Sequence, residues 1–464
     1  MKMRECIHGI DAMVPLLDGS VVRYVNLDNA ASTPPMKSVL KAINELAPYY
    51  SSVHRGTGFK SRLCTDAYDR AHEIIARFVG SDLRTNTVIF VKNATEAINK
   101  LSHRLMAPED AFVVTTRMEH HSNDLPWRDH FRTLHVRTEP DGRLDEEHYD
   151  LLLEEYAGRI ALVTVTGASN VTGFIQPVHR MAEKAHAVGA RILVDAAQLA
   201  PHRKIDMKPD SAVDHIDYLA LAGHKMYAPY GTGALIGPRR GFLEGAPDYC
   251  GGGTVHVVTP DEVYWAGMPD RDEAGSPNVM GAVAMAAAAE SLMDEGMDRV
   301  AEHERELTEY ALRKLGEMED VQVYGERDPS RASEKVGVIP FNLKGTDHAL
   351  LAAVAGFEFG VGVRNGCFCA HPYVVELLQL TEPEIDRWRE QFLNGDKSCM
   401  PGMVRMSFGC YSSHDDVDRL LDALDMIRRR EYKGKYTQEP ETGEFHPEGY
   451  EDDFTGYWRY PGGS

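Results

Sequence analysis

The sequence lacks a long apolar run and a continuous apolar segment near its start. Its longest apolar stretch, residues 279–289, is rich in alanine and too short to cross a bilayer, so we expect a buried helix there. Glu5, His8 and Asp11 interrupt the N-terminal region, where a signal peptide needs an unbroken apolar segment. We therefore expect a cytoplasmic protein with no membrane partner.

Basic residues are also few for the length of the chain. The 50 Lys and Arg residues stand against 71 Asp and Glu residues, which gives a formal net charge of -21. A field of this sign repels phosphate, so we expect no nucleic-acid partner and no anionic-membrane surface. The seven cysteines are irregularly spaced and odd in number, which indicates a reducing compartment rather than a disulfide framework.

The length of 464 residues favours two domains rather than one hydrophobic core. Short apolar runs alternate with helical patterns up to about residue 300, which is typical of an α/β domain with a mostly parallel sheet. The runs expected to be buried strands are residues 88–91, 112–114, 161–163, 192–194, 218–221 and 234–236.

The remaining sequence predicts a smaller α+β unit. A charged helix is expected over residues 293–315, followed by strands at 321–324, 336–343, 357–363 and 404–408 and a closing helix capped at Ser413. We predict an N-terminal segment (1–44) packing with the small domain, a large domain (45–300), a small domain (301–430) and a tail (431–464). Because the acidic tail carries eight aromatic side chains, we expect it to pack on the body or on a partner subunit.

The most informative residues are Asp195, which ends a buried-looking strand, and Lys225, which lies in a glycine-flanked turn thirty positions later. Separately, an aspartate after a strand is a common helix N-cap, and most lysines are surface charges. In this order, with Gln198 one turn beyond the acid and His224 beside the lysine, they match what a pyridoxal phosphate enzyme needs. The lysine forms a Schiff base with the aldehyde, and the carboxylate keeps the pyridine nitrogen protonated.

Three further segments follow predicted strands. Ala94 and Thr95 begin a helix whose positive end could hold a phosphate, although a helix cap without a ligand would be the preferred interpretation if this motif stood alone. His120 could lie on a planar cofactor. A zinc site there is disfavoured, because adjacent side chains such as His120 and His121 diverge and no further ligand is near, so we predict no metal. The Asn170 amide could reach a phenolic oxygen, although such a turn is often only a turn.

Several ordered motifs resemble the class V group of fold-type I pyridoxal phosphate enzymes, and within it the second group of cysteine desulfurases and selenocysteine lyases. The resemblance runs from Leu27 to Asp418. It implies an α/β fold whose large domain has a seven-stranded sheet between helices. The most specific motifs are Val-His-Arg-Gly at 53–56, Met-Glu-His-His at 118–121, Gly-His-Lys at 223–225, Ala-Gly-Ser-Pro-Asn at 274–278 and Arg-Asn-Gly-Cys-Phe-Cys-Ala-His-Pro at 364–372.

Carried over residue by residue, the resemblance implies pyridoxal 5'-phosphate as the cofactor. Lys225 would be its Schiff-base lysine, Asp195 would pair with the ring nitrogen and His120 would stack on the ring. The other residues implied to bind the cofactor are Gln198 and Asn170 at the phenolic oxygen, Thr95, Ala94 and His224 at the phosphate, and Ser276 from the second subunit of a homodimer.

The resemblance also implies a reaction, in which L-cysteine, or L-selenocysteine, is converted to L-alanine. Arg405 would clamp the substrate carboxylate by a bidentate contact, and Cys369 would receive the sulfur as a persulfide and pass it to an acceptor, as in iron–sulfur cluster assembly. The glycine-rich segment and the cationic Arg364 suit such a reactive thiol. The other residues implied to bind substrate are Asn29, Ala30 and His54.

Two positions depart from the family pattern. Ala222 stands where the family usually has a phosphate-binding serine, and Cys367 gives a Cys-Phe-Cys arrangement that is similar to the molybdenum cofactor sulfurases. Cys367 could relay a persulfide, form a transient disulfide or be only a small core residue. The alternatives to a desulfurase are a selenocysteine lyase, a C–S lyase, an epimerase, an aminotransferase or a cofactor-binding protein without activity.

Overall fold

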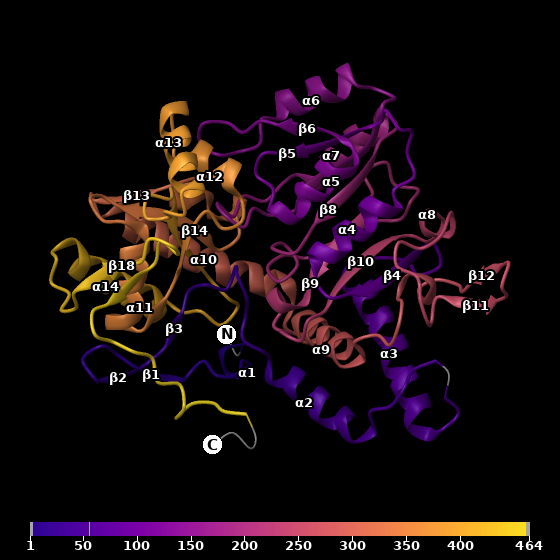
Figure 1. The fold of residues 1–464 in the computed structure, drawn as a ribbon, viewed down its shortest axis with the longest axis horizontal. Helices are drawn as coiled ribbons and strands as arrows, with labels where there is room; N and C mark the ends of the chain where they lie inside the picture. Colours follow the sequence, from indigo (N-terminus) through magenta and orange to yellow (C-terminus); the bar gives the residue numbers. More distant parts are fainter. Residues whose placement is uncertain (1–2, 55, 461–464) are drawn as a thin grey trace.

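The computed structural model describes residues 3–54 and 56–460 of the chain. Arg55 of the motif at 53–56, the first two residues of the predicted N-terminal segment and the last four of the predicted tail lie outside the described residues. One body contains a large sheet with its helices, and the orange-to-yellow C-terminal elements form a second body beside it (Figure 1). Within the described ranges, no helix combines the length and apolarity of a bilayer crossing.

The large sheet has seven strands in the order β4-β10-β9-β8-β7-β5-β6. Only β10 runs antiparallel to its neighbours, which confirms the predicted mostly parallel seven-stranded sheet. Six strands were predicted, whereas β6 was not, because its side chains are largely half-exposed at the sheet edge. The strands are β4 (Asn86–Val91), β5 (Phe112–Thr116), β6 (Arg132–Val136), β7 (Ile160–Thr166), β8 (Arg191–Asp195), β9 (Tyr218–Ala222) and β10 (Gly233–Pro238).

Helices cover both faces of this sheet because its strands alternate between two apolar cores. In β4, Val88 and Phe90 enter one core and Ile89 the other, as the period-two geometry of a strand requires. The first core includes α2 (Lys37–Leu46), α3 (Phe59–Phe78), α6 (Glu146–Glu155), α7 (Val178–Ala187) and α9 (Val279–Glu295). The second includes α4 (Ala94–Arg104), α5 (Leu125–His130) and α8 (Arg239–Leu243).

The smaller unit has an antiparallel sheet in the order β13-β14-β17-β16 and a core of its own. Its strands are β13 (Val321–Val323), β14 (Val338–Leu343), β16 (Arg364–Gly366) and β17 (Met403–Ser407). Its helices are α10 (Met297–Gly316), α11 (His348–Phe359), α12 (His371–Leu377), α13 (Glu382–Leu393) and α14 (His414–Arg428). The predicted cap at Ser413 is confirmed as a capping box with Asp416 at the start of α14.

One predicted strand was wrong, and one predicted helix was confirmed except at its start. Residues 357–363 are not one strand, because α11 continues to Phe359 and ends at Gly360 in the left-handed conformation, with φ of 63°. Only the two-residue β15 (Val361–Gly362) follows. The helix expected over 293–315 is broken at Gly296, whose φ of 90° ends α9 and lets α10 begin in a new direction.

The N-terminal segment and the tail both contact the smaller unit. β3 (Val25–Asn26) pairs with β15, whereas α2 contains the boundary predicted at residue 44 and packs against α9. In the tail, Glu358 of α11 accepts hydrogen bonds from the Gly434 amide and the Tyr436 hydroxyl. The expected packing of the tail on the body is confirmed for this part, and the domain boundaries stay predictions. The remaining short elements are α1 (Met3–Cys6), β1 (Met13–Pro15), β2 (Val21–Arg23), β11 (Val255–Val258), β12 (Val263–Trp265), β18 (Tyr436–Gln438) and β19 (Phe445–Pro447).

Candidate active site

Five of the predicted functional residues lie at the carboxyl ends of five parallel strands of the large sheet. Asp195 is the last residue of β8, and Lys225 ends the short turn Gly223–Lys225 directly after β9. Thr95, His120 and Asn170 follow β4, β5 and β7 in the same way. Ligands in open α/β sheets bind at this edge, where neighbouring parallel strands end together.

The Lys225 amine is buried at this edge of the sheet and is weakly basic. Its Nζ donates to Gln198 Oε1 at 3.2 Å. Burial lowers the pKa of Lys225 to about 8, although the nearby Asp195 carboxylate favours the charged form. A substantial fraction of the amine is therefore neutral near physiological pH, as attack on an aldehyde requires.

Asp195 is 5% exposed, and its Oδ1 accepts a hydrogen bond from the Ala197 amide at 3.0 Å. Burial raises the pKa of Asp195, opposed by this amide and by the positive charge of Lys225. A buried carboxylate in this state favours a cationic partner, such as a protonated ring nitrogen.

His120 is a neutral imidazole with a defined proton position. Burial, followed by the charge of Lys225, lowers the pKa of His120 to about 3. Its Nδ1 accepts a hydrogen bond from the Ser122 amide at 3.1 Å, so the ring proton lies on Nε2. The side chain therefore presents a flat, uncharged ring with one N–H donor.

The start of α4 offers donors for an anion. Asn93 Oδ1 accepts from the Glu96 amide, and the Thr95 hydroxyl lies 2.7 Å from the Ser122 hydroxyl. Burial lowers the pKa of His224 to about 4, with a further contribution from Lys225, so its imidazole is neutral. A helix N-terminus with adjacent hydroxyls suits a phosphate group.

Cys369 lies on a strained loop that is tied to the same edge. Phe368 and Cys369 have φ of 53° and 55°, a left-handed conformation that costs free energy for residues other than glycine. The Asn170 side-chain amide donates to the Phe368 carbonyl at 2.7 Å, and the His121 amide donates to the Cys369 carbonyl at 2.8 Å. The loop backbone is therefore fixed while Cys369 itself remains exposed.

Arg405 is the buried cation beneath this loop and is 2% exposed. One terminal nitrogen donates to Asp28 Oδ1 at 2.8 Å and the other to the Asn170 carbonyl at 2.9 Å. Its guanidinium carbon lies 4.8 Å from the centre of the Phe368 ring. Its buried Nε has no hydrogen-bond partner among the described residues, so donor capacity remains for a carboxylate.

The other predicted substrate residues fall into two groups. Asn29 is fully occupied, because its amide nitrogen donates to the Asn26 and Ser407 carbonyls and its oxygen accepts from Tyr411. Ala30 donates its backbone N–H to the Ser407 hydroxyl at 2.8 Å. These hydrogen bonds fix the backbone of Asn29 and Ala30, which directly follow Asp28 in the sequence.

Arg364 is exposed and lies 4.0 Å from the second Asp28 oxygen. Asp28 was not predicted to bind substrate, although it directly precedes Asn29 and Ala30 in the sequence. Its acidic side chain beside two neighbouring residues of interest was the available signal.

His54 and Ser276 lie together in a different place. Both line a cavity of about 750 Å³ whose lining does not include Lys225. Ser276 is exposed, and His54 has φ of 65° and contacts Asp69 at 3.2 Å. Their predicted roles, one of which requires a second subunit, stay predictions.

Cys367 differs from Cys369 in its surroundings. It is 5% exposed, and its Sγ donates to the Pro401 carbonyl at 3.0 Å. Burial raises the pKa of Cys367 to about 12, with a further contribution from Cys369. This geometry favours a structural thiol.

Comparison with known proteins identifies the class of this fold and site. The model of the family "Aminotransferase class-V" matches residues 25–420. The structure of an apo cysteine desulfurase from Thermococcus onnurineus aligns with a TM-score of 0.76 and 29% identity, covering 88% of this chain and 95% of that one. The chain therefore belongs to the class-V aminotransferase family.

Within that family the chain groups with the cysteine desulfurases. It is 34% identical to the cysteine desulfurase of Haloferax volcanii over 89% of this chain and 91% of the relative. It is also 34% identical to a probable cysteine desulfurase of Streptomyces coelicolor, covering 89% of this chain and 95% of the relative. The structure of the Escherichia coli cysteine desulfurase CsdA aligns with a TM-score of 0.73 and 25% identity, covering 93% and 98%. The predicted family, enzyme class and fold are confirmed.

Proposed function

We propose that this protein converts L-cysteine to L-alanine and carries the released sulfur as a persulfide on Cys369. The observation that carries the proposal is that Asn170, which follows β7 of the large sheet, makes hydrogen bonds with both Phe368 and Arg405 of the smaller unit. Its side chain holds the Phe368 carbonyl, and its own carbonyl accepts from Arg405. The reactive thiol, the carboxylate clamp and the strand edge bearing Lys225 are thereby one assembly.

We propose pyridoxal phosphate as the cofactor, since the donors at this edge match its three functional parts. A buried carboxylate, Asp195, suits the ring nitrogen, the weakly basic Lys225 suits the aldehyde, and the start of α4 suits the phosphate. When bound, the cofactor supplies an electron sink at the substrate α-carbon. The other residues assigned to hold it are His120, Gln198, Asn170, Ala94, Thr95, His224 and Ser276 of the partner subunit in a homodimer.

The residues of this chain perform the remaining tasks. Arg405 binds the substrate carboxylate, with the exposed Arg364 adding positive charge at the entrance. The neutral Lys225 amine takes a proton from the substrate α-carbon, which its pKa of about 8 allows at physiological pH. His120 keeps its hydrogen on Nε2 and can donate a hydrogen bond from it to a bound ligand.

Sulfur transfer balances without an external oxidant. The Cys369 thiolate attacks the substrate sulfur, an S–S bond forms and the carbon–sulfur bond breaks. One thiol of the enzyme and one molecule of cysteine thus give one persulfide and one alanine. Cys369 is exposed on its loop, so an acceptor protein or small molecule can collect the sulfur.

The biological setting is part of the proposal. We propose a cytoplasmic enzyme that supplies sulfur for iron–sulfur cluster assembly, and the seven irregularly spaced cysteines suit a reducing compartment. L-Selenocysteine is a second candidate substrate, since the same clamp and thiol would serve it. A relay through Cys367, as in a molybdenum cofactor sulfurase, is disfavoured by its burial and its bond to Pro401.

The test is alanine production from L-cysteine, with a thiol reductant present, by the parent and by Cys369→Ala. We expect the variant to lose nearly all alanine formation and all protein-bound persulfide. The matched control is Cys399→Ala, which removes another exposed thiol and should behave as the parent. Equal activity in the Cys369 variant, or pyruvate in place of alanine, would assign the enzyme to the lyases or to another class V reaction.

A further inference from the structure

Two histidines and an aspartate meet at the end of the sheet opposite the active site. His186 lies in the last turn of α7, and His215 and Asp217 lie just before β9. Lys225 follows the other end of β9, and a strand of five residues spans about 16 Å at roughly 3.3 Å per residue. The cluster is therefore separate from the proposed chemistry.

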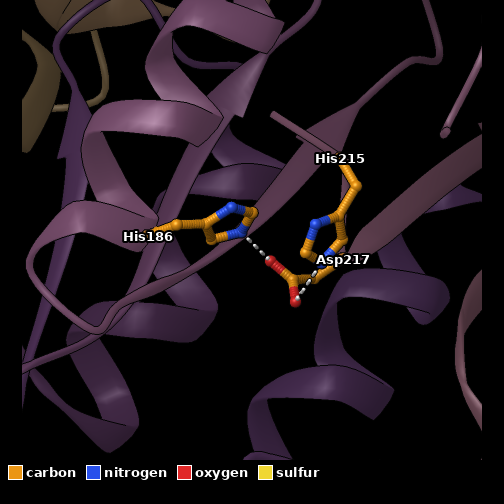
Figure 2. Close-up of side chains that lie close together, drawn as sticks. All are labelled: His186, His215 and Asp217. Atoms are coloured by element: carbon orange, nitrogen blue, oxygen red, sulfur yellow. Dashed lines mark hydrogen bonds and ion pairs between the residues drawn. The ribbon is translucent and has the colours of Figure 1, made fainter. Parts of the chain in front are cut away.

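The three side chains point toward one another (Figure 2). His186 Nε2 lies 2.9 Å from Asp217 Oδ2, and His215 Nε2 lies 3.5 Å from Asp217 Oδ1. One ligand atom from each residue can be chosen so that all three lie within 4.8 Å of one another. The two rings stack with centroids 4.3 Å apart.

In His186 and His215, the hydrogen bond made by Nδ1 orients the ring so that Nε2 faces Asp217. His186 Nδ1 donates to the Val213 carbonyl at 2.7 Å, and His215 Nδ1 donates to the Ala212 carbonyl at 2.7 Å. Because a carbonyl only accepts, each Nδ1 must carry a hydrogen, and in the neutral ring Nε2 is then a lone pair. Metal-binding histidines are oriented by outer hydrogen bonds of this kind.

The aspartate is oriented as well. The Ile192 amide of β8 donates to Asp217 Oδ2 at 2.9 Å, which fixes the carboxylate plane. The two Nε2 lone pairs and the Asp217 carboxylate face one another. All three carry negative partial charge, so they repel unless a positive charge lies between them. Two bound protons or one divalent cation can supply that charge, and the cation replaces both protons.

We propose that His186, His215 and Asp217 form a binding site for a divalent transition metal, with Zn²⁺ as the preferred ion and a fourth position open to water. Two imidazoles and one carboxylate are ligands of the type that Zn²⁺ prefers. Bonds of about 2.1 Å in a tetrahedron separate ligand atoms by about 3.4 Å, which is compatible with one ligand atom from each residue lying within 4.8 Å of the other two.

A metal here has a structural role. It links the end of α7, the segment before β9 and, through the Ile192 amide, the start of β8. These elements carry Asp195 and Lys225 at their opposite ends. Removing the metal is therefore expected to lower the melting temperature and to leave the turnover number of the cofactor-loaded enzyme unchanged.

The experiment measures Zn²⁺ bound per chain after chelator treatment, reloading and desalting of the cofactor-loaded protein. The background is Cys369→Ser, since an exposed thiol also binds zinc. His186→Gln and His215→Gln remove one ligand each. The matched control is His179→Gln, which lies in the same helix and whose Nδ1 donates to the Asp214 carbonyl at 2.8 Å, outside the cluster.

We expect one Zn²⁺ per chain in the background and in the control, and an affinity lower by about 10-fold to 100-fold in each ligand variant. At a Zn²⁺ concentration roughly 100 times the Kd, the melting temperature of the control should rise by about 2–3 °C. The melting temperature of the ligand variants should rise by less, about half as much for a 10-fold loss of affinity and hardly at all for a 100-fold loss.

Substoichiometric zinc in the unmutated cluster would overturn the proposal, and this result does not depend on the folding of any variant. Unchanged zinc binding in both ligand variants would also overturn it. Cobalt(II) is the spectroscopic probe. Its absorption should lack the thiolate charge-transfer band, whereas a strong band of that kind would place the metal on the remaining cysteines and refute the assignment.

Discussion

Replacing Asp28 by asparagine is expected to lower the KM for L-cysteine about 5-fold to 10-fold. In the ligand-free protein, Asp28 Oδ1 accepts from Arg405 at 2.8 Å, so it occupies a donor that the substrate carboxylate would use. Substrate binding must exchange one carboxylate for another at a buried guanidinium. The neutral amide of the Asp28→Asn variant would still accept a hydrogen bond but would no longer compete as an anion.

The magnitude follows from the strengths of the two bonds. A hydrogen bond to a charged group contributes about 1.5–3 kcal/mol, and because Arg405 is charged in both proteins, the carboxylate bond lies toward the upper end of this range and the amide bond toward the lower end. The exchange therefore becomes easier by roughly 1–1.5 kcal/mol, which corresponds to a factor of about 5–10 in binding. The ligand-free variant should melt at a lower temperature, because buried Arg405 loses its counter-charge.

The assay is the initial rate of alanine formation at varied L-cysteine concentration, with the Kd of L-alanine measured on the cofactor-loaded enzyme. Asp18→Asn is the control, since it removes an exposed partner of Lys433 at 3.0 Å and should change neither constant. A KM and Kd that stay at the parent values, or rise, would refute the role given to Asp28 as a competitor.

Three other changes test the buried charges and thiols. Lys335 is fully buried, its Nζ has no partner among the described residues, and burial lowers its pKa to about 7. The pKa of Lys335 is lower in the folded protein than in the unfolded chain. The free-energy cost of burying its charged amine is therefore full below pH 7 and decreases up to about pH 10.5. Lys335→Met should therefore stabilise the fold by roughly 2 kcal/mol at pH 6.5 and less at pH 9.5, measured by denaturant unfolding; a gain that does not shrink with pH would contradict this. Burial opposes ionisation of Glu304, but His202 and Arg203 outweigh it and lower its pKa to about 2. Ionised Glu304 therefore stabilises the fold fully above about pH 4.5, and this contribution is lost toward pH 2. Glu304→Gln should lower the melting temperature at pH 7, and by less at pH 4. An equal loss at both pH values would refute the pairing of Glu304 with His202 and Arg203. Cys367→Ala should keep alanine formation and the Cys369 persulfide within about twofold of the parent, because a thiol with a pKa of about 12 is not a nucleophile at neutral pH. An activity assay and mass spectrometry measure the two quantities. Loss of the persulfide in this variant would establish a relay through Cys367.

Much of the fold could be predicted because buried parallel strands are continuous apolar runs that helical periodicity does not imitate. The predictions failed where local pattern and tertiary packing diverge. Residues 357–359 are apolar enough for a strand, but the left-handed Gly360 ends a helix there. The charged pattern over 293–315 is helical on both sides of Gly296, so only the φ of 90° reveals two helices.

The candidate site was predictable where chemistry requires one residue type after a strand, as for Asp195 and Lys225. Asp28 was missed because its importance comes from contact with Arg405, which lies 377 positions away in the sequence. The metal-site proposal was missed for the same reason. His186 and Asp217 belong to separate segments, and only the pairing of β8 with β9 and the packing of α7 on β8 bring them together.

The contacts of Arg405 with both the Asn170 carbonyl and the Phe368 ring make the clamp and the sulfur-bearing loop thermodynamically linked. Any shift of the guanidinium as it takes up a carboxylate changes the free energy of the loop conformation. By reciprocity, loading Cys369 with sulfur must alter affinity for the amino acid by the same factor by which the amino acid alters the loop equilibrium. If Arg405 and Cys369 have the roles proposed for them, the affinity for the next molecule of cysteine would depend on whether the sulfur has already left Cys369.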